Sequence, residues 1–181
     1  DRGRLQFFSS YPQLDLELYF ASGVYRNTAT PLQKQLAAYM KGMDEQQAVN
    51  FLLRFVQTSL KYETDEKQFG RENYLFPEET LFYPYSDCED RAVLFAWLVE
   101  SLLGLDVIGL DYPGHVAAAG RVCCAAGFLF GQPTVFNPEL DIAGSQRAHP
   151  MCNHDGGAVF HQALHGIHDE GFRMGIYGAG R

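Results

Sequence analysis

The chain has 181 residues, 46% of them hydrophobic and 20% charged, which is a globular composition sufficient for one buried core. The net charge is −8 with only 14 Lys and Arg, and no basic stripe stands out, which argues against a nucleic-acid partner. No apolar run is long enough to span a bilayer, and the four cysteines follow neither a zinc spacing nor a disulfide framework. We therefore expect one domain over residues 1–181, with reduced thiols.

The N-terminal part predicts an arm followed by a helix. Residues 1–25 combine aromatic side chains, a proline and partial alternation, which is typical of an extended arm or an edge strand. Thr30 as N-cap and Pro31 as the first helical residue then open a helix, and Gly42 closes it.

A second helix and a long loop come next. Asp44 and Gln47 have the spacing of a capping box, and the apolar residues after them recur at helical spacing. Residues 63–86 are aromatic and punctuated by prolines, so they predict a loop. A loop of that length in a compact domain is usually functional or wrongly assigned. The apolar positions of the helix are Val49, Leu52, Leu53, Val56 and Leu60.

The stretch SDCEDRAVLFAWL predicts a central helix that begins at a cysteine. Asp87 is the expected N-cap, and Gly104 the expected end. Glu89 and Asp90 lie in the first turn, where the helix dipole favours acids. Three strands are expected after the helix, over residues 105–112, 115–124 and 128–136, with a Pro-Gly turn between the first two.

The lengths of these elements predict that a thiol and an imidazole lie close together. A helix over 88–103 runs about 24 Å away from Cys88, and a strand over 105–111 returns about 23 Å. If the two pack antiparallel, the chain arrives at His115 beside the start of the helix. A thiolate is stabilised by a helix N-terminus and by an imidazolium, so this pair suits nucleophilic catalysis. The neighbouring acids oppose the thiolate unless their carboxylates turn toward backbone N–H groups or Arg91.

A third residue is expected to orient the imidazole. A hairpin that turns near Ala126 places Asn137 opposite His115, and Asn accepts a hydrogen bond from imidazole in papain-like Cys-His-Asn sites. Asp141 takes this role if the hairpin is longer.

With these residues identified, the chain resembles the transglutaminase-like superfamily, in particular its bacterial cysteine proteinases. The resemblance rests on FGRENYLFPEETLFYPYSDCEDRAVLFAWLVESLLGLDV followed by DYPGHVAAA, and it covers residues 69–120. It implies an α+β fold with a papain-like, transglutaminase-like core, in which the nucleophile-bearing central helix packs on an antiparallel sheet. It also implies Cys88 as nucleophile and His115 as base. The family usually has Asp followed by Pro as third residue, whereas this chain has Asn137 followed by a proline.

The resulting function is cysteine-dependent acyl transfer on amide or peptide bonds, with hydrolysis preferred to transfer to an amine on the subfamily resemblance. We expect a protein or peptide substrate and no metal or organic cofactor. The sequence does not fix the compartment, and the resemblance to bacterial proteinases suggests the cell envelope or periplasm.

Two other functions compete with acyl transfer. A non-catalytic module that binds protein or peptide would explain Asn137 in place of Asp and the atypical composition of residues 121–181. A metal-binding protein would use His161, His165 and His168, which are spaced as on one helical face. For those histidines a solvated, His-rich tail is the simpler interpretation.

Overall fold

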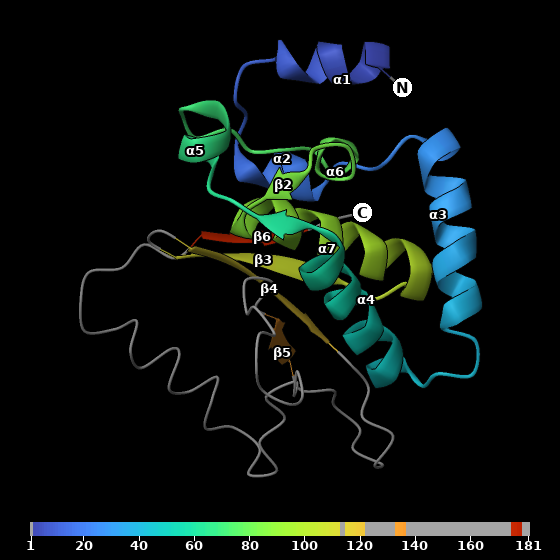
Figure 1. Ribbon diagram of the computed structural model, residues 1–181. Coiled ribbons are helices and arrows are strands. Elements are labelled where there is room, and N and C mark those ends of the chain that lie inside the picture. Colours follow the sequence, from blue (N-terminus) through green and yellow to red (C-terminus); the bar gives the residue numbers. More distant parts are fainter. Residues whose placement is uncertain (1, 113–114, 122–132, 137–174, 179–181) are drawn as a thin grey trace, which may run out of the picture.

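The computed structural model describes residues 2–112, 115–121, 133–136 and 175–178. These residues form a mixed fold of helices and two small sheets, which agrees with the predicted α+β class at that level (Figure 1). The helices are α1 (Arg2–Ser9), α2 (Leu16–Phe20), α3 (Arg26–Tyr39), α4 (Glu45–Ser59), α5 (Asp65–Phe69), α6 (Pro77–Thr80) and α7 (Cys88–Leu103). The strands are β1 (Lys61–Tyr62), β2 (Tyr85–Ser86), β3 (Val107–Tyr112), β4 (His115–Arg121), β5 (Pro133–Phe136) and β6 (Gly175–Gly178).

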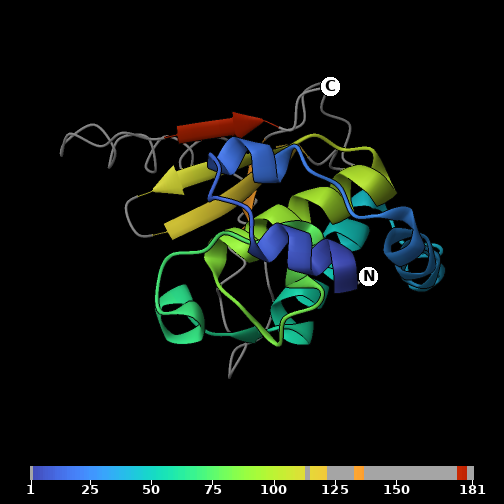
Figure 2. The same cartoon turned by 90° about the horizontal axis from the view of Figure 1, so that it is seen from above.

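The larger sheet has the strand order β5-β4-β3-β6, and every neighbouring pair is antiparallel. Strands β3 and β4 form a hairpin that pairs Tyr112 with His115. Helices α2 and α7 lie along one face of this sheet (Figure 2). The second sheet is the short parallel pair of β1 and β2, and β2 leads directly into α7.

Helix α7 is the centre of the core, as predicted. It begins at Cys88 after the N-cap Asp87, and it ends at Gly104, whose φ of 68° is the left-handed conformation that glycine adopts without strain. All its residues from Cys88 to Val99 are buried. Helix α4 packs against it with the apolar face that the sequence predicted, except that Leu60 lies just beyond the helix and is only partly buried.

The predicted extended arm over residues 1–25 is wrong, because this segment forms α1 and α2. In α2, Leu16, Tyr19 and Phe20 are buried at helical spacing. The Tyr19 ring stacks on Phe76 with ring centroids 4.5 Å apart. These contacts come from a distant part of the chain, so local alternation could not reveal them.

The next two helices agree in part with their predictions. Helix α3 begins at Arg26, five residues before Pro31, so that the proline lies inside the helix and leaves one hydrogen bond of the ladder unmade. The capping box of α4 is confirmed. The Gln47 N–H donates to Asp44 Oδ1 at 2.7 Å, and the Asp44 N–H donates to Gln47 Oε1 at 3.1 Å.

The predicted loop over 63–86 and the predicted register of the third strand also need correction. The strand itself is present as β5 within the predicted range 128–136, of which residues 128–132 lie outside the described part of the chain. The loop segment contains α5, α6 and β2. Helix α6 packs against α7, β2 leads into α7, and Asp65 of α5 lies near Asp90 of α7. A turn near Ala126 would have paired Ala118 with Thr134, but Ala118 pairs with Phe136, a shift of two residues. Such a shift keeps every side chain on its predicted face of the sheet. Strand β6 was not predicted.

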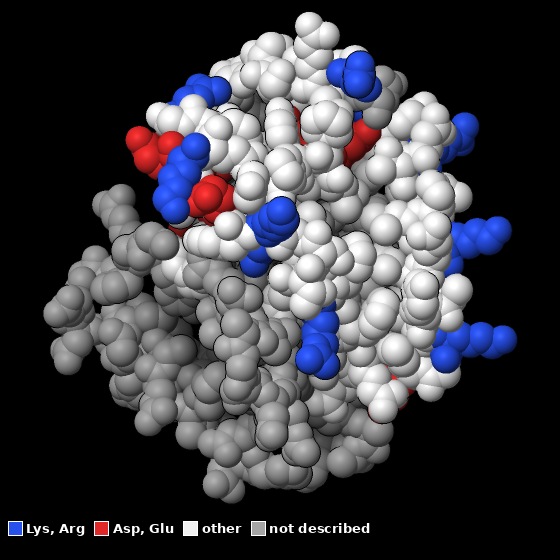
Figure 3. Space-filling model, viewed as in Figure 1, with Lys and Arg blue, Asp and Glu red and all other residues white. Residues whose placement is uncertain are grey.

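The surface of the described part carries no continuous basic region on the face seen in Figure 3, where Lys and Arg side chains project singly. Within the described residues, no helix combines the length and apolar character that crossing a membrane requires.

The packing of α2 on the sheet is tight at Gly109 of β3. A Cβ added at Gly109 would lie 2.5 Å from Cε2 and Cζ of Phe20. Gly109→Ala is therefore expected to lower the free energy of unfolding by about 1–3 kcal/mol, measured by denaturant titration. In a Phe20→Ala background the same substitution should cost far less. Equal costs in the two backgrounds would contradict the packing of Phe20 over Gly109.

Candidate active site

The candidate site lies at the N-terminus of α7, where a cysteine and several ionisable residues are buried together. Cys88 is 8% exposed, and the acids on either side of it are less exposed still. The helix start is buried because α6 and the first residues of β4 pack against it. The ionisable residues buried here are Asp87, Glu89, Asp90 and Arg91.

The Cys88 thiol contacts Glu89 and Val116. Its Sγ donates to Glu89 Oε2 at 3.0 Å, and the Val116 backbone N–H donates to Sγ at 3.5 Å. Val116 directly follows His115, so the bond lengths of the backbone place the Cα of His115 within about 6 Å of the sulfur. The chain thus returns from the end of α7 to its start, as the element lengths predicted.

The contact between the sulfur and the imidazole itself stays a prediction. His115 is partly exposed, and both ring nitrogens are shielded from solvent. Val116 belongs to the cluster on the α7 face, whereas Ala117 belongs to a separate cluster on the other face. Alternation along β4 places His115 on that second face, at the end of the strand.

The third member of the predicted site cannot be placed, because Asn137 and Asp141 lie outside the described residues. The same holds for the other three cysteines and for the histidines that were considered as metal ligands, namely Cys123, Cys124, Cys152, His161, His165 and His168.

The structure adds Asp65, from α5, to the acids around Cys88. Burial and the nearby Asp87 raise the pKa of Asp65 to about 7. The same two causes raise the pKa of Glu89 to about 8. Burial, followed by the charges of neighbouring acids, raises the pKa of Asp90 well above its ordinary value. Burial therefore favours the protonated form of these carboxyls, and at neutral pH it does so more strongly for Glu89 than for Asp65.

Backbone donors hold several of these carboxyls, as the sequence reasoning required. Asp90 Oδ1 accepts from the Leu75 N–H at 2.8 Å, and Asp65 Oδ2 accepts from the Asn73 N–H at 2.6 Å. Both donors belong to residues 63–86, so this segment folds around the acids.

Arg91 fastens the segment before the cysteine to α7. Its guanidinium donates to Ser86 Oγ at 3.2 Å and to the Leu60 carbonyl at 2.8 Å. The Tyr62 ring lies over it, with its centroid 5.2 Å from Cζ. Arg91 thereby links both strands of the small sheet to the first turn of the helix.

The acids also have a spacing that a cation could use. Their ligand oxygens lie within 4.8 Å of one another in two overlapping sets. Oxygen ligands of this kind suit Ca²⁺ or Mg²⁺. A bound cation would balance the negative charge of the carboxylates, which protonation otherwise removes. The sets are Asp65, Glu72 and Glu89, and Asp65, Asp87 and Asp90. Such a cation would balance charge and has no part in the expected catalysis, so the absence of a cofactor from that reaction stays an expectation.

Sequence reasoning missed Asp65 and Glu72 as neighbours of the site. The resemblance places Glu78 and Glu79 near the entrance of the site, but the expectation that they lie on the surface is wrong, because both are buried. Glu79 of α6 is buried, and this burial raises its pKa to about 7. The only signal was the unusual length and aromatic content of residues 63–86. Their acids could not be assigned to the site without the tertiary fold.

No protein-family model matches the chain, and no curated protein matches it. The likeness to transglutaminase-like enzymes therefore rests on the motif residues, and the function is a proposal.

The buried acids predict how stability depends on pH. Unfolded Asp65 and Glu89 release their protons near 3.8 and 4.5, whereas the folded protein holds them to about 7 and about 8. Between these values the unfolded state binds fewer protons, so the free energy of unfolding should fall as pH rises, by up to about 1.4 kcal/mol per pH unit for each group. Denaturant titrations from pH 5 to 8 in EDTA measure this slope.

Asp65→Asn and Glu89→Gln should each reduce the slope, because the neutral side chains have no proton to release. Glu66→Gln, which changes an exposed residue of the same helix as Asp65, is the control and should leave the slope unchanged. A slope unaltered by Asp65→Asn and Glu89→Gln would show that these carboxyls do not hold protons in the folded state.

Proposed function

We propose that the protein is a cysteine-dependent acyl-transfer enzyme with a transglutaminase-like, papain-like core, acting on amide or peptide bonds. The observation that carries the proposal is the 3.5 Å contact from the Val116 N–H to Cys88 Sγ. It fastens the thiol of the central helix to the strand that begins with His115. A buried helix N-terminus, a thiol and an imidazole on the adjoining strand are the parts that nucleophilic cysteine chemistry needs.

The surroundings of Cys88 support a thiolate better than the sequence suggests. The thiol lies in the first turn of a helix of 16 residues, whose dipole favours a negative charge there. The Val116 N–H donates to the sulfur, and it would donate more strongly to a thiolate. Glu89, with a pKa raised to about 8 by burial, is mostly protonated at neutral pH and adds little repulsion.

In the proposed reaction, His115 takes the proton from Cys88, and Sγ attacks the carbonyl carbon of the substrate. The carbon–nitrogen bond breaks, His115 gives the proton to the leaving amine, and a thioester remains on the enzyme. The Cys88 backbone N–H, at the first residue of α7, would help to stabilise the oxyanion, together with a donor from the preceding aromatic segment.

A second acceptor then resolves the thioester. Water gives a peptidase or amidase, and an amine gives a cross-linking transferase. We favour hydrolysis on the subfamily resemblance, with a protein or peptide as substrate. Asn137 or Asp141 would orient His115, and neither needs a metal or an organic cofactor for this role.

One observation favours a second candidate, a non-catalytic module that binds protein or peptide. The Cys88 thiol is 8% exposed and donates to Glu89, an arrangement that also suits a structural thiol at a helix end. The two candidates differ in whether Cys88 is a reactive thiolate at neutral pH.

The rate at which iodoacetamide alkylates Cys88, followed across pH by mass spectrometry of the peptide that contains it, separates these candidates. For an enzyme, half-maximal reactivity is expected at least about one pH unit below the ordinary thiol value. His115→Ala should raise that midpoint and slow alkylation at pH 7 by about tenfold, because the thiolate loses its imidazolium partner.

Asp106→Asn is the matched control for His115→Ala, because Asp106 is exposed just before β3, at the end of the hairpin away from His115. It should leave the profile unchanged. An ordinary thiol midpoint that does not depend on His115 would contradict the enzyme and support the binding module.

A further inference from the structure

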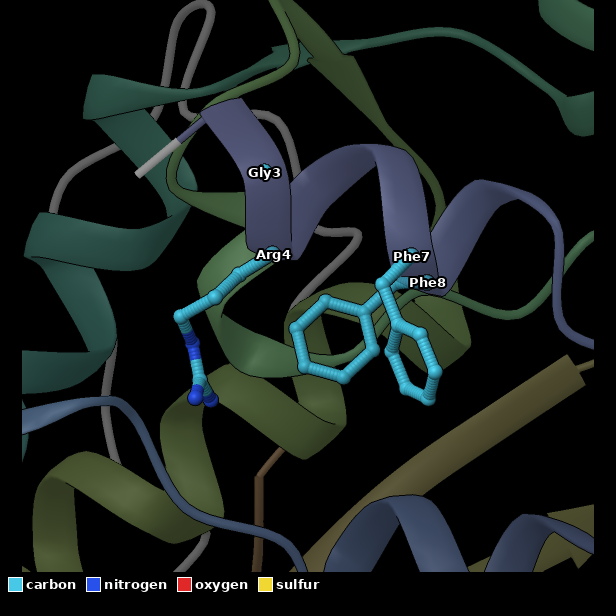
Figure 4. Close-up of a pocket in the computed structure, with 4 residues that line it drawn as sticks. All are labelled: Gly3, Arg4, Phe7 and Phe8. Atoms are coloured by element: carbon cyan, nitrogen blue, oxygen red, sulfur yellow. The ribbon is translucent and has the colours of Figure 1, made fainter.

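A second candidate site lies on α1, apart from the cysteine. A cavity of about 510 Å³ is lined by Gly3, Arg4, Phe7 and Phe8, which all belong to this helix. This cavity is open to solvent rather than enclosed. Figure 4 shows that the side chains of Arg4, Phe7 and Phe8 project from the same side of α1. A cation and two aromatic rings therefore share one cavity.

The Arg4 guanidinium is fixed in place by its neighbours. Its Nε donates to Glu78 Oε2 at 3.2 Å, and Glu78 is 3% exposed. The Phe8 and Tyr25 rings lie near the guanidinium, with centroids 5.5 Å and 4.7 Å from its Cζ. The Tyr25 N–H donates to the same Glu78 oxygen at 3.3 Å, which holds the acceptor as well.

The end of the guanidinium still has donors available. Of the three guanidinium nitrogens of Arg4, only Nε donates a hydrogen bond to another of the described residues. The Arg4 side chain is 40% exposed, so its two terminal nitrogens can be approached from solvent. A planar pair of N–H donors in a fixed orientation is the arrangement that binds a carboxylate bidentately.

The apolar surface continues along α1 beyond the cavity. Phe7 is 56% exposed and Tyr11 is 46% exposed, and their ring centroids are 5.0 Å apart. A small acid would occupy only the cavity and would leave Tyr11 uncovered. A peptide that ends in the cavity would place its preceding residues over Phe7 and Tyr11.

We propose that this cavity binds the free C-terminus of a peptide or protein whose last side chain is apolar. Arg4 receives the terminal carboxylate, and Phe7 and Phe8 contact the last side chain. The site uses no residue of the Cys88 centre, so it does not depend on the proposed function.

Binding of the tripeptide N-acetyl-Ala-Ala-Phe, compared with the same peptide as its C-terminal amide, tests the proposal on the unmodified protein. Isothermal titration calorimetry should show saturable binding of the acid and at least about tenfold weaker binding of the amide, because the amide loses a charge-assisted hydrogen-bonded pair. Equal affinities, or no saturable binding of the acid at millimolar concentration, would overturn the proposal.

Variants locate the binding on α1. Arg4→Gln should remove the preference for the acid, and Phe7→Ala should weaken both peptides. Arg2→Gln, which removes an exposed arginine outside the cavity from the same helix, is the control and should leave both affinities unchanged. Loss of the preference for the acid in Arg2→Gln, or its retention in Arg4→Gln, would also overturn the proposal.

Discussion

The structure depends on how the N-terminus of α7 is buried. The first four residues of this helix, Cys88 to Arg91, and the N-cap before them all have side chains that water scarcely reaches. Carboxylates that kept full charge there without partners would cost several kcal/mol each. Protonation and hydrogen bonds from backbone N–H groups offset this cost of burial. At Asp90, for example, the pKa is raised and the Leu75 N–H donates to the carboxyl. The segment between α4 and α7 folds around these acids to supply such donors.

The same constraint determines what Cys88 can do. A fully charged acidic cluster would suppress the thiolate, whereas a protonated Glu89 leaves the helix dipole, the Val116 N–H and, in the proposed site, the His115 imidazolium as the main influences on the sulfur. Acids that look unfavourable beside a nucleophile in the sequence are thus compatible with nucleophilic chemistry in the fold. They also make the site sensitive to pH and to any cation that their oxygens could hold.

Local signals predicted the central elements well. The bounds of α7 followed from Asp87 and Gly104, and the strand and helix lengths placed the start of β4 beside the thiol. The predictions that were wrong concern segments whose structure depends on contacts with residues far away in the sequence. The predicted arm instead forms α1 and α2, from which Phe8 and Tyr19 pack on Phe76, and the β4–β5 register depends on a connection whose length the sequence does not reveal. The clustering of Asp65 with the acids of α7 is likewise a tertiary property.

The most direct test is the distance between Cys88 Sγ and the nearer His115 ring nitrogen in an experimental structure. The Val116 N–H of β4 lies 3.5 Å from the sulfur, which brings the start of this strand, and with it His115, to the N-terminus of α7. The account predicts a separation of no more than about 4 Å. A ring that faces away from the sulfur at more than about 7 Å, with the Val116 contact intact, would contradict it.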